Sequence, residues 1–87
     1  MKIRIRYFAS LREIVGQSEE TLNVDAGTRV SDIRTQLLTR YARLQAILDR
    51  SVCAVNRSYV HAETVLHEND EIVFIPPMGG GRLLWSR

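Results

Sequence analysis

Near its C-terminal end the chain reads Glu71-Ile72-Val73-Phe74-Ile75-Pro76-Pro77-Met78-Gly79-Gly80-Gly81. The first five residues are almost continuously apolar, which is typical of a central strand covered on both faces. The two prolines fix φ and lack an N–H donor, so sheet pairing is expected to stop there. The glycines carry no Cβ and tolerate backbone angles that are closed to other residues. The stretch therefore predicts a buried strand that continues into a narrow segment.

We call residues 77–81 the arm. Extended at roughly 3.3–3.6 Å per residue, the arm reaches on the order of 15 Å, about the depth of an active-site cleft. Our interpretation is that a globular body holds the arm and delivers its main-chain carbonyl end to another protein's active site. The alternative is an ordinary flexible chain end, for which glycine is equally suitable.

Hydrophobic periodicity predicts the elements that precede this stretch. The first strand runs from Lys2 to Ala9, with Ile3, Ile5 and Tyr7 on one face and Arg4, Arg6 and Phe8 on the other. The further strands are Glu20–Val24, Val52–Val55, Ser58–Val60 and Glu71–Ile75. The helical segments are one turn over 11–15 that Gly16 ends, an amphipathic helix with the stripe Val30, Ile33, Leu37, Tyr41 and Leu44, and a short piece over 46–48.

The order of these elements predicts the fold class. Two hairpin strands, a helix across the sheet and further strands give an α+β layer structure. The connection from the second strand through the helix is long enough for a crossover, so the sheet is expected to be mixed. Residues 61–66 are expected to form a loop with Leu66 turned inward, and Asn69-Asp70 a turn with left-handed backbone angles.

Composition excludes several classes of protein. With 87 residues, 45% of them hydrophobic, the chain makes one folded domain. There is no apolar run that could span a membrane and no signal peptide, and a lone cysteine fits a reducing cytoplasm. Arginine and lysine number 12 against 10 acidic residues, but Arg82 and Arg87 follow the glycines, so the balance up to Gly81 is even. Without a coherent basic stripe, a nucleic-acid partner is not expected.

Side chains elsewhere offer weaker candidates. Cys53 is a conceivable persulfide carrier, but its place in an apolar strand favours a buried structural thiol. His61 and His67 do not have the spacing of metal ligands, so no metal site is predicted. Phe8 and Arg12 are candidates for docking a partner, because an exposed aromatic beside an arginine is typical of an interface anchor. The alternative for Phe8 is that the helical turn over 11–15 covers it.

Four stretches together resemble the ubiquitin-like β-grasp sulfur carriers, and among them the small subunits of molybdopterin synthase. They are Phe8-Ala9 with Leu11-Arg12-Glu13 and Gly16; Val30–Leu37; Ala54-Val55-Asn56; and Asp70-Glu71-Ile72 through Pro76-Pro77 to Gly80-Gly81. The Pro-Pro-x-x-Gly-Gly ending is fairly specific, and the other pieces are weak individually. The resemblance implies a β-grasp fold with about five strands and one main helix, and a carrier domain over residues 1–81.

The resemblance also implies a function. Gly81, preceded by Gly80, would be adenylated by an ubiquitin-activating-type enzyme that uses ATP and Mg, and then converted to a thiocarboxylate. The thiocarboxylate would donate sulfur to a pterin precursor in the large subunit of molybdopterin synthase. Partner contacts are expected from Phe8, Arg12 and the run Pro76, Pro77, Met78 and Gly79. The chain would bind no cofactor and use no catalytic side chain of its own.

Two alternatives stay open: a carrier for thiamine or cysteine synthesis, and a ubiquitin-like binding or conjugating module. Two departures from the pattern also stand out. Asn69-Asp70 replaces the more usual Gly-Asp, and Arg82-Leu83-Leu84-Trp85-Ser86-Arg87 follows the glycines. This tail is a processed extension that a protease removes, a product of cloning, or a retained functional segment. Gly79-Gly80 is the alternative frame for the active end.

Overall fold

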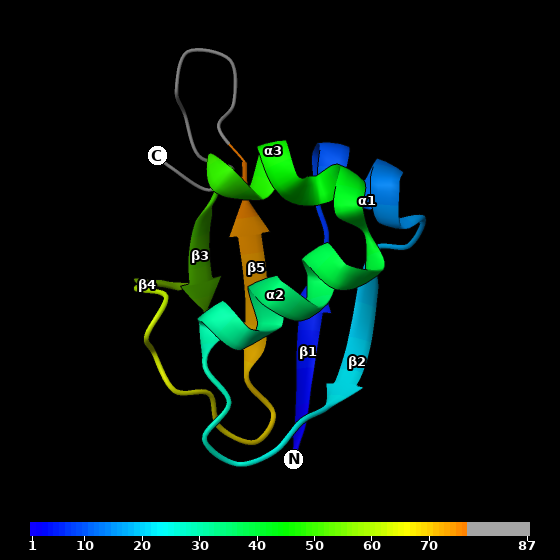
Figure 1. The fold of residues 1–87 in the computed structure, drawn as a ribbon. Helices are drawn as coiled ribbons and strands as arrows, with labels where there is room; N and C mark the ends of the chain where they lie inside the picture. Colours follow the sequence, from blue (N-terminus) through cyan, green and yellow to red (C-terminus); the bar gives the residue numbers. More distant parts are fainter. Residues whose placement is uncertain (77–87) are drawn as a thin grey trace.

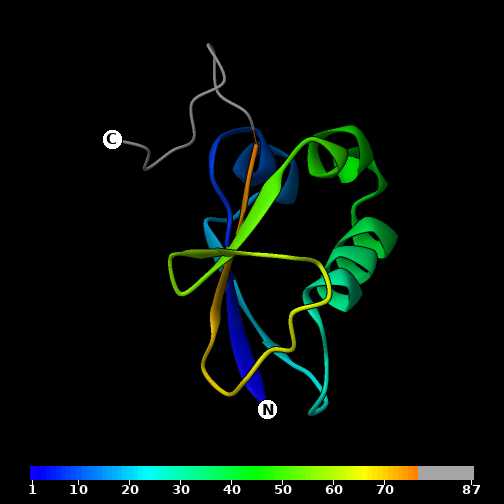
Figure 2. The ribbon, with the colours of Figure 1, turned by 90° about the vertical axis from the view of Figure 1, so that its left-hand side faces the viewer.

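The computed structural model describes residues 1–76, which form one mixed sheet with helices on one face (Figures 1 and 2). The elements are β1 (Lys2–Arg6), α1 (Ala9–Val15), β2 (Glu19–Asn23), α2 (Val30–Arg40), η1 (Ala42–Leu44), α3 (Gln45–Asp49), β3 (Val52–Val55), β4 (Ser58–Val60) and β5 (Glu71–Ile75). The predicted α+β architecture, with five strands and one main helix, is confirmed.

Strand β5 lies at the centre of the sheet, whose order is β2-β1-β5-β3-β4. It runs parallel to β1, with Ile5 opposite Ile72, and antiparallel to β3, with Cys53 opposite Phe74. Residues 72–75 of β5 are all buried. The prediction of a mixed sheet and of a central last strand covered on both faces is therefore confirmed.

The core lies between the sheet and α2. Ile3 and Ile5 of β1 are fully buried there, as the alternating pattern predicts. From the helix layer come Val30, Ile33, Leu37, Leu44 and Leu48, and from the sheet also Tyr7, Cys53, Val55, Ile72 and Phe74. Leu66, in the loop before β5, is 1% exposed, so its predicted inward position is correct. We call the opposite side of the sheet the outer face.

The first strand is shorter than the sequence predicts. It ends at Arg6, and Ala9 already belongs to α1, so the predicted strand end at Ala9 is wrong. Phe8 keeps an extended backbone, with φ −122° and ψ 155°, and serves as the N-cap of α1. Gly16 ends this helix with φ 88°, in the left-handed region that favours glycine. The alternating pattern thus continues over Tyr7 and Phe8, the two residues between the end of β1 and the start of α1.

The main helix also ends earlier than its apolar stripe predicts. Helix α2 stops at Arg40 because Tyr41 adopts φ −133° and ψ 77°. The one-turn helix η1 then returns Leu44 to the core, where it is fully buried. The stripe therefore predicts the burial of Val30, Ile33, Leu37 and Leu44 correctly, whereas Tyr41 is only partly buried and the helix is not continuous. The short helical piece predicted over 46–48 is confirmed as α3.

Buried and half-buried polar contacts hold the helix layer to the sheet. The Tyr7 hydroxyl donates to Oε1 of Glu20 at 2.8 Å, and Arg40 at the end of α2 pairs with Oε2 of the same carboxylate at 2.7 Å. Burial, and then the bond to Glu20, raise the pKa of Tyr7 above its ordinary value, so the hydroxyl stays a donor. This contact joins the residue directly after β1 to β2 and α2.

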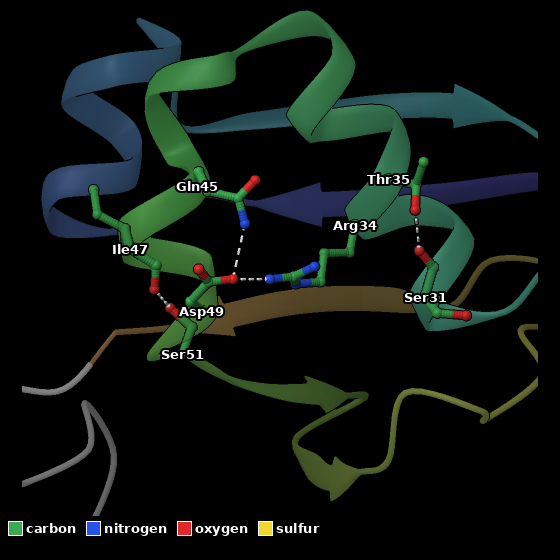
Figure 3. A network of polar contacts seen from close by, with 7 residues as sticks. All are labelled: Ser31, Arg34, Thr35, Gln45, Ile47, Asp49 and Ser51. Carbon is green, nitrogen blue, oxygen red and sulfur yellow. Dashed lines mark hydrogen bonds and ion pairs between the residues drawn. The ribbon is translucent and has the colours of Figure 1, made fainter.

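A second polar network joins α2 to α3 (Figure 3). Arg34 of α2 forms an ion pair with Oδ1 of Asp49, which also accepts a bond from Gln45 Nε2 at 2.9 Å. Ser51 closes the end of α3 by donating to the Ile47 carbonyl at 2.7 Å.

Among residues 1–76, no helix is both long and apolar enough to cross a bilayer.

Candidate functional site

The base of the arm is fixed at the end of the central strand. Both neighbours of β5 pair with it, and Val52 of β3 lies opposite Ile75, the last residue before the prolines. Pro76 is buried. It lines a hollow of about 200 Å³ together with Ser10, Ala46, Ile47 and Arg50, which come from α1 and the α3 region. We call this end of the sheet the arm end.

Most of the predicted acyl-carrying segment lies outside the described residues. Pro77, Met78, Gly79, Gly80 and Gly81 belong to it, so their predicted roles stay predictions. Pro76 directly precedes the arm, and it is the residue of the run Pro76–Gly79 whose surroundings are described. It leaves the sheet between α1 and the end of α3 (Figure 1).

Two of the short stretches quoted from the sequence meet at the other end of β5. Asn56 Nδ2 donates to Asp70 Oδ1 at 2.9 Å, and Asn56 Oδ1 accepts the Glu71 backbone N–H at 3.0 Å. Asn56 and Asn69 have φ of 50° and 67°, which asparagine tolerates better than most residues. The side chain of Asn56 thus ties the β3–β4 turn to the first residue of β5.

Phe8 lies on the outer face, as the alternation predicts. Its ring packs against the buried cluster of Ala54, Val73 and Ile75 and remains partly exposed. Helix α1 therefore does not cover Phe8 completely. The guanidinium of Arg6 stands over the ring, 5.4 Å from its centroid.

A cleft of about 390 Å³ opens beside Phe8. Its other lining residues are Arg6, Arg57, Glu71 and Val73. Glu71 is held by Arg4 at 3.5 Å and Arg6 at 3.9 Å, while no ion pair of Arg57 occurs within residues 1–76. An apolar floor with a cationic rim suits an aromatic or aliphatic anchor from a partner.

The arginine that accompanies Phe8 is one that sequence reasoning missed. Arg12, the predicted neighbour, is exposed on α1, whereas Arg6 makes the contact with the ring. Alternation along β1 already places Arg6 and Phe8 on one face, and that signal identifies the pair. Arg57 reaches the same cleft only through the β3–β4 turn, for which the local sequence gave no signal.

Cys53 is a structural thiol. It is 9% exposed, and burial raises its pKa from 9.0 to about 12. Its Sγ contacts the Ala54 carbonyl at 3.9 Å. Because the thiolate is the nucleophilic form, a thiol with this pKa is unreactive at neutral pH. The structural interpretation of Cys53 is therefore favoured over a persulfide carrier.

The two histidines do not form a ligand cluster with other residues. His67 Nδ1 lies 3.9 Å from Asp70 Oδ2 and is largely exposed. Within the described part of the chain, no three side chains of histidine, cysteine, aspartate or glutamate gather closely enough to hold a metal ion. What the described body offers is a buried strand end at the base of the arm and a cleft at Phe8 on the outer face.

The chain is similar to curated and solved proteins over nearly its whole length. It is 32% identical to the molybdopterin synthase sulfur carrier subunit of Chlamydomonas reinhardtii, covering 93% of this chain and 100% of that one. The subunit of the same name from Mycobacterium tuberculosis is 35% identical, with 93% and 99% covered.

Solved structures agree on the fold. A putative molybdopterin converting factor subunit 1 from Pyrococcus furiosus superposes with a TM-score of 0.80 at 27% identity, covering 90% of this chain and 99% of that one. A chain of the complex between subunits 1 and 2 of molybdopterin-converting factor from Helicobacter pylori has a TM-score of 0.67 at 19% identity, with 90% and 96% covered, and shows the fold alone.

The profile of the ThiS family matches residues 5–81, so the match begins within β1 and ends at the third glycine. That region contains most of the sheet, the main helix and the whole arm, and it leaves residues 82–87 outside. With a ubiquitin-like β-grasp fold confirmed by its structural neighbours, this chain belongs to the ThiS family.

Proposed function

We propose that this chain is a sulfur carrier whose Gly81 becomes a thiocarboxylate and donates sulfur to a pterin precursor within molybdopterin synthase. One observation carries the proposal: a buried central strand leads directly into Pro-Pro-x-x-Gly-Gly, and the family match ends at that last glycine. The names of the two relatives described above support the same role. The carrier domain is residues 1–81.

The chemistry needs a free carboxylate at Gly81. Such a group is ionised at neutral pH and attacks the α-phosphorus of ATP as a nucleophile, with pyrophosphate leaving. A sulfur nucleophile then attacks the acyl carbon, and AMP leaves. ATP and Mg belong to the activating enzyme, and this chain contributes placement of the reacting carbon. While residues 82–87 remain attached, Gly81 has an amide in place of the carboxylate, so activation requires a chain that ends at Gly81. A tail-removing protease is the partner that we propose for this step.

The partners follow from this chemistry. A large subunit receives the thiocarboxylate, and the Helicobacter pylori complex of subunits 1 and 2 supports such a partner. We place its contact on the cleft around Phe8 and on the run from Pro76 to Gly79, with Met78 at the channel entrance. Arg12 lies nearby on α1 and contributes to the same partner contacts. The lone reduced Cys53 fits a cytoplasmic location.

The test compares a chain ending at Gly81 with the 87-residue chain in ATP–pyrophosphate exchange by the activating enzyme. The shorter chain is expected to support exchange and the longer one to give none. Equal exchange by both forms would contradict the proposal. A matched control, Gly81→Ala in the shorter chain, should fold normally and transfer sulfur poorly, because the added methyl obstructs a narrow channel.

The same samples separate this function from its alternatives. Incubation with the large subunit and the pterin precursor should return the carrier unlinked, with its thiocarboxylate lost. Recovery of the chain joined to a partner's lysine would identify a conjugating module. Retention of the thiocarboxylate under these conditions would identify a carrier for another pathway.

A further inference from the structure

The arm end carries arginines without an acidic partner. Arg12 on α1, Arg43 on η1 and Arg50 directly after α3 are all exposed. None of them forms an ion pair with any residue of the described chain, whereas four others do. Those four, Arg4, Arg6, Arg34 and Arg40, are held by carboxylates.

The three arginines belong to α1, to η1 and to the residue directly after α3. Helices α1, η1 and α3 together cover the end of the sheet at which β5 finishes (Figures 1 and 2). Arg50 lines the same hollow as Pro76. Arg50 therefore lies at the base of the arm, and Arg12 and Arg43 belong to the neighbouring helices.

Nearby carboxylates neutralise this charge only in part. Asp49 precedes Arg50 in sequence, but it is already bound by Arg34 and Gln45 (Figure 3). Glu13 on α1 is exposed, and Glu19 of β2 faces Arg6 in the β1–β2 register. The helices at the arm end thus carry an excess of positive charge.

The opposite end of the sheet carries exposed charges of both signs. The loops over 24–29 and 61–70 lie there (Figure 1), with the carboxylates of Asp25, Glu63 and Glu68 and the guanidinium of Arg29. An excess of one sign at one end of a small protein raises the rate of productive encounter with a partner of the other sign. The three arginines without a carboxylate partner therefore distinguish the arm end.

We propose that Arg12, Arg43 and Arg50 dock an acidic protein surface on the activating enzyme, around the entrance that admits the arm. This inference rests on the proposed function and names the chemistry of one partner. A carrier must reach that enzyme, react and leave, and rim charges accelerate association without a lasting complex. The apolar cleft at Phe8 suits the longer-lived contact with a large subunit. A protein is favoured over a nucleic acid because the three arginines are single charges on separate segments and form no continuous basic stripe.

The test uses the chain ending at Gly81 and measures KM and kcat for ATP–pyrophosphate exchange at low and high salt. Arg50→Gln should raise KM about threefold at low salt and Arg43→Gln/Arg50→Gln about tenfold, with kcat retained. High salt should remove these differences, because it shortens the Debye length to less than about 8 Å. Lys2→Gln is the matched control: it removes one exposed charge at the opposite end and should leave KM within about twofold.

Three results would overturn the inference. The first is an unchanged KM for the double variant at low salt, and the second is an equal effect of Lys2→Gln, which would point to net charge alone. The third is salt-sensitive binding to duplex DNA that the double variant loses while its KM stays that of the parent chain. If the parent chain supports no exchange at any concentration, the proposed function fails, and this inference falls with it.

Discussion

Replacing Tyr7 by Phe tests the hydrogen bond from the Tyr7 hydroxyl, just after β1, to Glu20 of β2, whose carboxylate also binds Arg40 of α2. The change keeps the ring, which is 2% exposed, and removes the one hydroxyl that donates to Glu20 at 2.8 Å. A hydrogen bond to a charged group contributes about 1.5–3 kcal/mol. Glu20 keeps its ion pair with Arg40, whose side chain is 42% exposed. The free energy of unfolding should therefore fall by about 2 kcal/mol, in the lower part of that range.

The assay is thermal and urea unfolding followed by circular dichroism. For a domain of this size, about 2 kcal/mol corresponds to a fall in Tm of roughly 10 °C, with the urea m-value unchanged. Tyr41→Phe is the matched control. It removes a hydroxyl that accepts from Arg40 at 3.0 Å in an exposed position, and it should cost less than about 0.5 kcal/mol. If the free energy of unfolding of Tyr7→Phe lies within about 0.5 kcal/mol of that of the parent chain, the Tyr7 hydroxyl does not stabilise the fold as argued.

Three further changes follow from the same structure. Asn56→Ala removes two hydrogen bonds and places alanine at a positive φ; because the site is exposed, we expect about 1–2 kcal/mol of destabilisation in urea, and no change would show that this contact is incidental. Cys53 should resist iodoacetamide at pH 8 until the protein unfolds. Its contribution to stability is complete below the ordinary pKa of 9.0 and is lost as pH rises towards about 12, so Cys53→Ala should flatten that pH dependence; rapid native alkylation would refute the buried thiol. Phe8→Ala should fold and should weaken binding to the large subunit more than about tenfold, as measured by calorimetry. An unchanged affinity for the large subunit would show that Phe8 is not part of the interface.

Strong local patterns predicted much of the fold correctly. Strands β3, β4 and β5 have the predicted bounds, because a continuous apolar run ends in prolines and an Asn56-Arg57 turn separates two short strands. Gly16 and Asn69 occupy the left-handed backbone positions that their residue types favour.

Long-range contacts explain where prediction failed. Tyr41 continues the apolar stripe of α2, so no local signal marks the break that its backbone angles make. Arg40, the last residue of α2, is held by Glu20, which lies twenty residues earlier in the chain. Likewise, the sheet brings Arg57 to the cleft of Phe8, and only the three-dimensional arrangement reveals that neighbour.

In the candidate site, too, some features follow from the local sequence and others depend on the folded chain. The arm is a local sequence feature of prolines and glycines, and its role stays a prediction because residues 77–81 lie outside the described residues. The excess of arginine at the arm end depends on which carboxylates are already paired, and pairing is a property of the folded chain.

The central claim is that the fold presents a bare main-chain acyl group to another protein's catalytic site. The most direct measurement is the intact mass of the protein purified from its native cell while molybdenum cofactor is being made. The account predicts a chain that ends at Gly81, partly with sulfur in place of one carboxylate oxygen. A population that still carries Trp85 and the rest of the tail, in cells that make the cofactor normally, would contradict it.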